Sequence, residues 1–173
     1  MILLAGIHGV GKTTFCNDIA KSLGIKYYIA SQLIEENSNI KINRDKKVNN
    51  ISHNQRILEA VLNKIQKENT HFILDGHFCL INADGEIERI DIEIFKRINP
   101  SAIIVITADT EVIMLRNKER FSLDMTEEFV ENFQKEEIKY AIYVGHNLNI
   151  PVKILKENEF DISKISEYLQ GVR

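Results

Sequence analysis

The chain has 173 residues, of which 44% are hydrophobic and 27% are charged, and this composition is typical of a single globular domain with a sizeable core. Its formal net charge of −3 argues against nucleic acid or a membrane surface as a partner. No apolar stretch approaches the ~20 residues that cross a bilayer, and Cys16 and Cys79 lack the spacing of metal ligands, so we expect a reduced, cytoplasmic protein.

The first fourteen residues, MILLAGIHGVGKTT, contain the most informative motif. The apolar run at residues 2–5 predicts a short buried strand, and residues 6–13 fit the pattern G-x-x-x-x-G-K-[ST] of a phosphate-binding loop. Glycines let successive N–H groups point at phosphate oxygens, and the following helix adds its positive N-terminal dipole. A glycine-rich turn that binds nothing is the alternative, but the flanking strand and helix favour a nucleoside triphosphate site. The predicted nucleotide contacts are Gly6, Gly9, Val10, Gly11, Lys12, Thr13 and Thr14.

After the loop, an apolar residue at every fourth position predicts an amphipathic helix over residues 12–23. Residues 25–30 are rich in aromatic and β-branched side chains and predict a second strand. Ser31 is expected to cap a short helix over residues 32–36 and is a candidate contact for an acceptor.

Residues 37–50 change character, because they are rich in Asn and Lys and contain few large apolar side chains. A solvated loop is one interpretation. The other is a flap that closes on an anionic substrate, for which Arg44 is a candidate contact, since loops of this length are uncommon unless functional.

Ser52 and Gln55 fit the S-x-x-Q capping box of a helix over residues 53–68, which carries a strong apolar stripe. Arg56 lies near the start of this helix, beside the stripe. A solvated position is expected for it, and contact with an acceptor phosphate is the alternative.

The rest of the chain continues the alternation, and the stripe formed by Phe129, Phe133 and Tyr140 is expected to pack in the core. Five strands that alternate with helices predict an α/β fold, namely a three-layer P-loop NTPase fold with a five-stranded parallel sheet and helices on both faces. The remaining expected elements are a strand at 72–75, a hairpin over 80–87 turning at Asp84 and Gly85, a helix over 92–98 capped by Asp91, a strand at 102–107, a helix from Asp109 or Thr110 to Arg120, a helix from about Asp124 to Gly145, a strand at 152–155 and a helix over 162–169.

Asp75 ends a predicted strand about sixty residues after the loop, where a carboxylate can hold Mg²⁺ together with the Thr13 hydroxyl. A turn-forming Asp before Gly76 is the alternative. Many P-loop ATPases place a glutamate at the Gly76 position to activate water, so glycine here favours phosphoryl transfer to another acceptor. His77 is a candidate to contact that acceptor or to help deprotonate a hydroxyl, and a structural histidine is the alternative.

Arg116 and Arg120 lie four residues apart and therefore share one face of the predicted helix, just before a short break. Arginines at such a position can close over the phosphates and neutralise the charge of the transition state. A solvated face paired with Glu119 or Asp124 is the alternative for each. The pair at the helix end favours the catalytic interpretation.

With these residues in place, nearly the whole chain resembles the adenylate-kinase-like group of P-loop nucleoside monophosphate kinases. The matching features are GIHGVGKTT, Asp75 with Gly76, and the strand and helix that end in two arginines. The resemblance implies one kinase-like domain over residues 1–173, with ATP and Mg²⁺ as cofactors, an acceptor-binding insertion at about 31–70 and a short lid at about 116–125.

Two departures from that group concern the acceptor. Adenylate kinases usually have an arginine a few residues after the aspartate-glycine pair, where this chain reads HFCL, and another in the short helix that here reads QLIEE. Either Arg44 or Arg56 substitutes for them, or the acceptor is not a nucleotide.

The sequence therefore predicts a kinase that moves the γ-phosphoryl group of ATP to a small acceptor, with a nucleoside monophosphate as first choice. Lys12, Arg116 and Arg120 are the predicted catalytic residues. The alternative is an ATP-gated regulatory protein with little turnover, for which residues 37–50 would be a docking loop. A nucleic-acid end kinase is disfavoured by the negative net charge.

Overall fold

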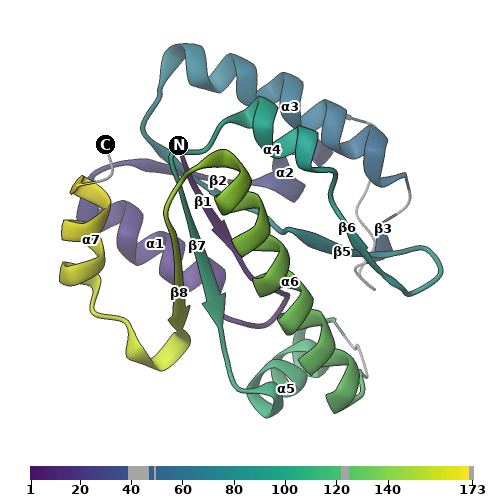
Figure 1. Ribbon diagram of the computed structural model, residues 1–173. Coiled ribbons are helices and arrows are strands. Elements are labelled where there is room, and N and C mark those ends of the chain that lie inside the picture. Colours follow the sequence, from purple (N-terminus) through teal and green to yellow (C-terminus); the bar gives the residue numbers. More distant parts are fainter. Residues whose placement is uncertain (39–46, 49, 122–124, 172–173) are drawn as a thin grey trace.

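The computed structural model describes residues 1–38, 47–48, 50–121 and 125–171. Its centre is a five-stranded sheet in the order β2-β4-β1-β7-β8, in which every neighbouring pair is parallel (Figure 1). The predicted fold class is confirmed. The strands are β1 (Ile2–Ala5), β2 (Lys26–Ile29), β4 (Phe72–Asp75), β7 (Ala102–Thr107) and β8 (Val152–Lys156).

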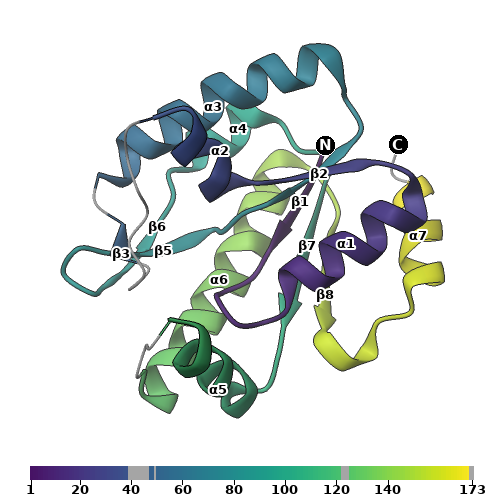
Figure 2. The same cartoon turned by 180° about the vertical axis from the view of Figure 1, so that it is seen from behind.

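Helices cover both faces of this sheet. Helices α1 (Lys12–Leu23) and α7 (Ile162–Gly171) pack together on one face, whereas α6 (Glu127–Leu148) crosses the other and packs on β7 and β8 (Figures 1 and 2). A third group lies beside β2 and β4 and packs helix on helix. It contains α2 (Ala30–Glu36), α3 (Ile51–Glu68) and α4 (Ile92–Ile98), while α5 (Thr110–Phe121) packs against α6 and the 3₁₀ turn η1 (Glu157–Glu159) follows β8.

A small second sheet stands apart from the main one (Figure 1). Strands β5 (Cys79–Asn82) and β6 (Ile87–Arg89) form the predicted antiparallel hairpin, and Gly85 takes a φ of 88° in its turn. Strand β3 (Lys47–Val48) adds in parallel to β5 and was not predicted. Two residues are too short to produce a periodic pattern, so this pairing depends on tertiary structure alone.

Two of the predicted helix caps are wrong. Helix α2 begins at Ala30 directly after β2, which leaves Ser31 inside its first turn instead of at its N-cap. Helix α3 begins two residues earlier than predicted, and its cap is Asn50, whose side chain accepts the N–H of His53 at 3.1 Å, not Ser52. Asn50 has a φ of 56°, a left-handed conformation that asparagine tolerates well, so it can end the preceding segment and cap the helix at once.

The predictions for two later helices had different outcomes, because the cap of α4 is the predicted residue and the cap of α6 is not. Asp91 caps α4 by accepting the N–H of Glu93 at 3.0 Å, as predicted. Helix α6 is capped by Thr126, which accepts the N–H of Phe129 at 3.2 Å, and Asp124 lies outside the described residues. Helix α6 also runs on to Leu148, because Gly145 does not end it.

The core is densest around β7, whose residues from Ala102 to Ile106 are fully buried. Phe133 and Tyr140 of α6 are buried and Phe129 packs against them, so the predicted core role of this stripe is confirmed. Among the described residues, no helix is both long and apolar enough to cross a lipid bilayer.

Candidate nucleotide-binding site

The glycine-rich loop connects the carboxyl end of β1 to the first turn of α1. Gly6, Gly9 and Gly11 have φ values of 139°, 92° and 94°, which side-chain-bearing residues rarely adopt. A Cβ at Gly6 would also overlap the carbonyl oxygen of Ile106 on β7. Gly11 is the N-cap of α1, so the positive end of the helix dipole faces the cavity that the loop encloses.

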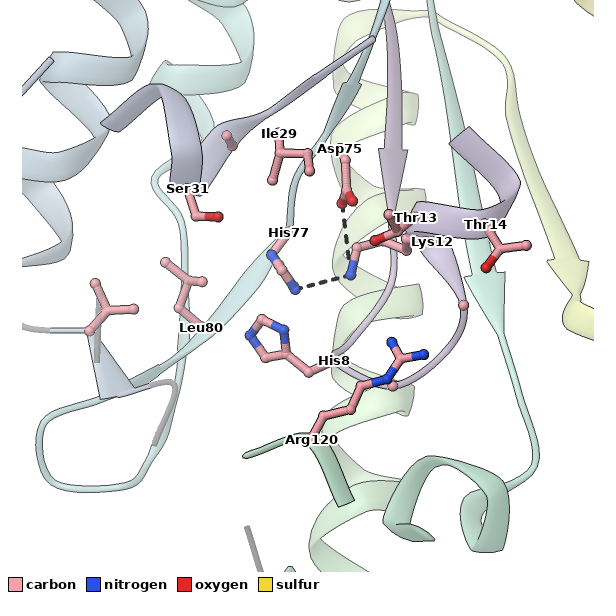
Figure 3. Close-up of a pocket in the computed structure, with 14 residues that line it drawn as sticks. His8, Lys12, Thr13, Thr14, Ile29, Ser31, Asp75, His77, Leu80 and Arg120 are labelled. Atoms are coloured by element: carbon pink, nitrogen blue, oxygen red, sulfur yellow. Dashed lines mark hydrogen bonds and ion pairs between the residues drawn. The ribbon is translucent and has the colours of Figure 1, made fainter. Parts of the chain in front are cut away.

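Lys12 is the most connected polar residue of the loop (Figure 3). It is 7% exposed, and its ammonium donates to the carbonyl oxygens of Gly6 at 2.6 Å and Ile7 at 3.3 Å. The same Nζ lies 3.2 Å from Nε2 of His77 and 3.8 Å from Oδ1 of Asp75. One cation thus connects the loop after β1 to the segment that follows β4.

Asp75 and Thr13 line the same cavity as Lys12 (Figure 3). Burial raises the pKa of Asp75, and the nearby charge of Lys12 opposes this shift in part. Carboxylate and hydroxyl oxygens are the ligands that Mg²⁺ prefers, and this ion usually takes only one or two protein ligands, with phosphate and water oxygens supplying the rest. The donor set therefore fits Mg²⁺.

His77 lies in the segment between β4 and β5, and its ring centroid is 4.5 Å from that of His8 in the loop. Because the Lys12 ammonium can only donate, Nε2 of His77 accepts in their contact. His77 faces the cavity from the side opposite α1, next to Ser31 and Leu80.

The two arginines of α5 have different surroundings. Arg120 lines the cavity and reaches it from the end of α5 (Figure 3). Arg116 donates to the carbonyl oxygen of Gly9 at 3.0 Å and forms an ion pair of 2.6 Å with Glu157, which follows β8. The neighbouring Asn117 is buried and donates to the carbonyl oxygen of His8 at 3.2 Å. Helix α5 is therefore attached to the glycine-rich loop at two consecutive carbonyls.

Glu137 of α6 is fully buried beneath the loop. Its carboxylate accepts the N–H of Gly6 at 3.1 Å, the N–H of Phe78 at 3.0 Å and the N–H of Cys79 at 2.7 Å. Burial raises its pKa to about 7, although these N–H donors and Lys12 act in the opposite direction. One carboxylate thus holds the first residue of the loop and the segment that carries His77.

Only some of the other predicted site residues line the cavity. Gly9, Gly11, Thr14 and Ser31 line the cavity, whereas Val10 is fully buried and packs in the core. Arg56 is exposed on α3 and is not among the residues that line the described cavities. Arg44 lies outside the described residues.

Sequence reasoning missed three residues around the loop, namely Glu137, Asn117 and Glu157. A signal existed for the first, since Glu137 falls in the apolar line of Phe133, Ala141 and Val144 on α6, where a solvated carboxylate does not belong. Asn117 and Glu157 carry no such local signal, because their contacts join segments that are far apart in sequence.

The fold and this loop together define a nucleotide-binding protein of the P-loop kinase-like class. A family model described as an AAA domain matches residues 5–134, and the chain therefore belongs to this family. The predicted resemblance to adenylate-kinase-like proteins is confirmed by a curated relative, an adenylate kinase of Thermoplasma acidophilum. It is 26% identical over 171 aligned positions, and the match covers 91% of this chain and 89% of the relative.

Solved structures agree at the level of the fold. A shikimate kinase from Bacteroides thetaiotaomicron matches with a TM-score of 0.59 and 15% identity, over 99% of this chain and 96% of that one. A shikimate kinase from Acinetobacter baumannii, in complex with shikimate, matches with a TM-score of 0.58 and 18% identity, over 99% and 90%. A sugar kinase from Janibacter sp. matches with a TM-score of 0.57 and 13% identity, over 98% and 91%.

Proposed function

We propose that this protein transfers the γ-phosphoryl group of ATP to a small-molecule acceptor, and that nucleoside monophosphates are the first acceptors to test. The observation that carries the proposal is the meeting of two cavities beside Lys12. The cavity around the glycine-rich loop contains Lys12, Thr13 and Asp75, and it shares five residues with a second cavity between the sheet and α2, α3 and α4. The shared residues are Ala30, Ser31, Val48, His77 and Leu80.

A donor nucleotide in the first cavity and an acceptor in the second would meet at these shared residues. An acceptor oxygen then forms a bond to the γ-phosphorus as the bond to the β–γ bridging oxygen breaks, and ADP leaves. Lys12, the loop N–H groups and Arg120 would stabilise the charge on the phosphates. Thr13 and Asp75 would hold Mg²⁺, which supplies further neutralisation of that charge. Catalysis is then mainly positioning and electrostatic stabilisation.

The same proposal assigns roles to two segments. The described residues of the segment 31–70 would form the acceptor-binding part, because α2 and α3 supply one wall of the second cavity. The segment 116–125, of which residues 122–124 lie outside the described residues, would act as a short lid. In it Arg120 would close over the transferring group, and Arg116 holds the loop through Gly9.

Two observations favour transfer over hydrolysis or regulation. The position after Asp75 is Gly76, whose N–H donates to the carbonyl oxygen of Leu4 at 2.9 Å and which has no side chain to activate water. The adenylate kinase and shikimate kinases that resemble this chain are named as enzymes, and none of these relatives supports a regulatory switch.

ADP release in the presence of ATP and Mg²⁺ tests the proposal. The acceptor panel contains AMP, CMP, GMP, UMP, their nucleosides and shikimate. We expect at least one compound to raise ADP release well above the rate without acceptor, and we expect the Lys12→Ala variant to lose this stimulation. The proposal is wrong if no compound of a broad panel raises ADP release above that of the Lys12→Ala variant.

A further inference from the structure

The second cavity has an apolar body that comes from five different elements. Leu3 and Leu74 reach it from the central strands, Ile34 from α2, Leu58 from α3, and Ile94 and Phe95 from α4. These side chains are all at least nine-tenths buried. A flat or compact ring would therefore be in contact with hydrocarbon over most of its surface.

Two amide side chains interrupt this apolar wall. Asn54 and Gln55 line the cavity from the first turns of α3 and are 2% and 6% exposed. Asn54 lies one helical turn before Leu58 and two before Leu62, so it occupies a position on the inner face where an apolar residue would be expected.

The amide oxygen of Asn54 is buried and has no hydrogen-bond partner in the part of the chain that the structure describes. An unpaired buried acceptor destabilises a folded protein, and native proteins satisfy nearly all such groups. A donor from a bound molecule would remove this penalty, which makes the Asn54 oxygen a recognition group for a ligand N–H or O–H.

Charge distinguishes the two cavities. Lys12, Asp75 and Arg120 line the first, whereas no Lys, Arg, Asp or Glu of the described residues lines the second. A carboxylate or phosphate at the inner end of the second cavity would lose its hydration without gaining a counter-charge from these residues. An anionic group is better placed at the shared end, next to Lys12.

We infer that the second cavity holds the inner part of the acceptor, an uncharged ring that donates an N–H or O–H to Oδ1 of Asn54, while its phosphoryl-accepting end lies at the residues shared with the first cavity. This inference rests on the proposed function and names the acceptor chemistry. A nucleobase with an amino group fits it. A ring that presents a carboxylate to the buried end does not.

The test compares acceptors that differ only in the predicted donor. AMP is paired with purine riboside 5′-monophosphate, and CMP is paired with the analogue whose base is 2-pyrimidinone, so that each pair differs by one amino group. For the pair that the wild-type protein accepts, removal of the amino group is expected to raise KM about tenfold with little change in kcat. The lost hydrogen bond stabilises the bound acceptor equally in the ground state and in the transition state.

The Asn54→Leu variant should raise KM for the amino-bearing acceptor by a similar factor and make the two members of the pair equivalent, since both changes remove the same contact. Asn63→Leu, an exposed position on the same helix, is the matched control and should leave both KM values unchanged. The analogue pair tests the contact in the unaltered protein even if Asn54→Leu fails to fold.

The outcomes separate this inference from the proposed function. If an acceptor keeps its KM in Asn54→Leu, or if both members of the accepted pair have equal KM values in the wild-type protein, Asn54 does not recognise the acceptor and only the inference fails. Shikimate as the preferred acceptor, with a KM that does not respond to Asn54→Leu, would also overturn it. If no acceptor stimulates ADP release, the proposed function itself fails.

Discussion

Glu137 offers the sharpest test of how this site is held together, because two physical effects compete at its carboxyl group. Three backbone N–H groups, from Gly6, Phe78 and Cys79, point at its oxygens and favour the charged form. Complete burial favours the neutral form, and burial wins, since the pKa of Glu137 is raised to about 7. The Glu137→Gln variant keeps the shape of the protonated side chain and removes its titration.

The direction of the pH effect follows from linkage. Between the ordinary glutamate pKa of 4.5 and the folded-state pKa of about 7, the folded protein keeps a proton that the unfolded chain has released. The stabilising contribution of Glu137 is therefore complete below pH 4.5 and is lost as the pH rises through 7. For these two pKa values the loss between pH 5 and pH 8 is roughly 2 to 3 kcal/mol. The amide NH₂ of Glu137→Gln cannot accept the N–H groups that one carboxylate oxygen accepts, which destabilises the variant equally at every pH. The pH-dependent part of the stability difference should therefore shift toward the variant between pH 5 and pH 8.

The assay is urea unfolding followed by far-UV circular dichroism, because the chain has no tryptophan to report by fluorescence. Taking the difference between wild type and variant cancels the other titrating groups. Glu136→Gln is the control: a hydrogen bond from Arg89 lowers the pKa of Glu136, so its contribution is lost only under acidic conditions and stays nearly constant from pH 5 to pH 8. A difference that grows in favour of wild type with rising pH would refute the reasoning, because the N–H donors would then outweigh burial.

Four further substitutions test the loop and its attachments. Lys12→Ala should abolish acceptor-dependent ADP release, and it should also lower the unfolding free energy, measured by urea unfolding, by about 1 kcal/mol or more, because it removes the ammonium's contacts with Gly6, Ile7 and His77 and leaves buried Asp75 without its counter-charge. Gly6→Ala should destabilise the protein by about 2 kcal/mol or more by the same measurement, because a side chain is strained at this φ and overlaps Ile106. Arg120→Ala should lower kcat at least tenfold with little change in the Kd for ATP, measured by titration calorimetry, if it acts on the transferring group. Arg116→Ala and Glu157→Ala should each raise the Kd for ATP by a similar factor, and the double variant should raise it no further than either single variant. A larger effect in the double variant would show that Arg116 acts independently of Glu157 and would contradict this prediction.

The fold was predictable because its elements carry strong local patterns. The run AIIVIT can only be a buried strand in a chain of this composition, and the loop motif fixes where β1 ends and α1 begins. Apart from the unpredicted strand β3 and the later end of α6, the errors lie at helix starts, where Asn50 and Thr126 compete with other capping residues of similar propensity. Where two neighbouring residues are both good N-caps, the local sequence does not show which one caps the helix, because tertiary packing fixes where its first turn begins.

The site was predictable only in the parts that one segment supplies. The glycine-rich loop is contiguous, and Asp75 ends β4, which pairs in parallel with β1, so its carboxyl end lies beside the loop. The contacts of Arg116 with Gly9 and Glu157 join three segments that the sequence separates by tens of residues, and no local pattern reports them. Asn54 was missed for another reason. It lies on the same face of α3 as the apolar residues that predicted the helix, and that pattern is recognised without it.

The position of Glu137 bears on how donor and acceptor meet. Its carboxylate holds the N–H of Gly6, at the start of the phosphate loop, and the N–H of Phe78, the residue next to His77. His77 lies where the two cavities join, so one side chain on α6 fixes the loop that would bind the donor relative to the segment that the acceptor would touch. Such a tie reduces the reorganisation needed for an in-line reaction, and it does so from beneath the site, where no ligand can reach it. The shorter carboxylate of Glu137→Asp should therefore lower kcat more than it changes the Kd for ATP. The phosphate loop and the segment that carries His77 would each keep their structure, but their alignment relative to one another would be lost.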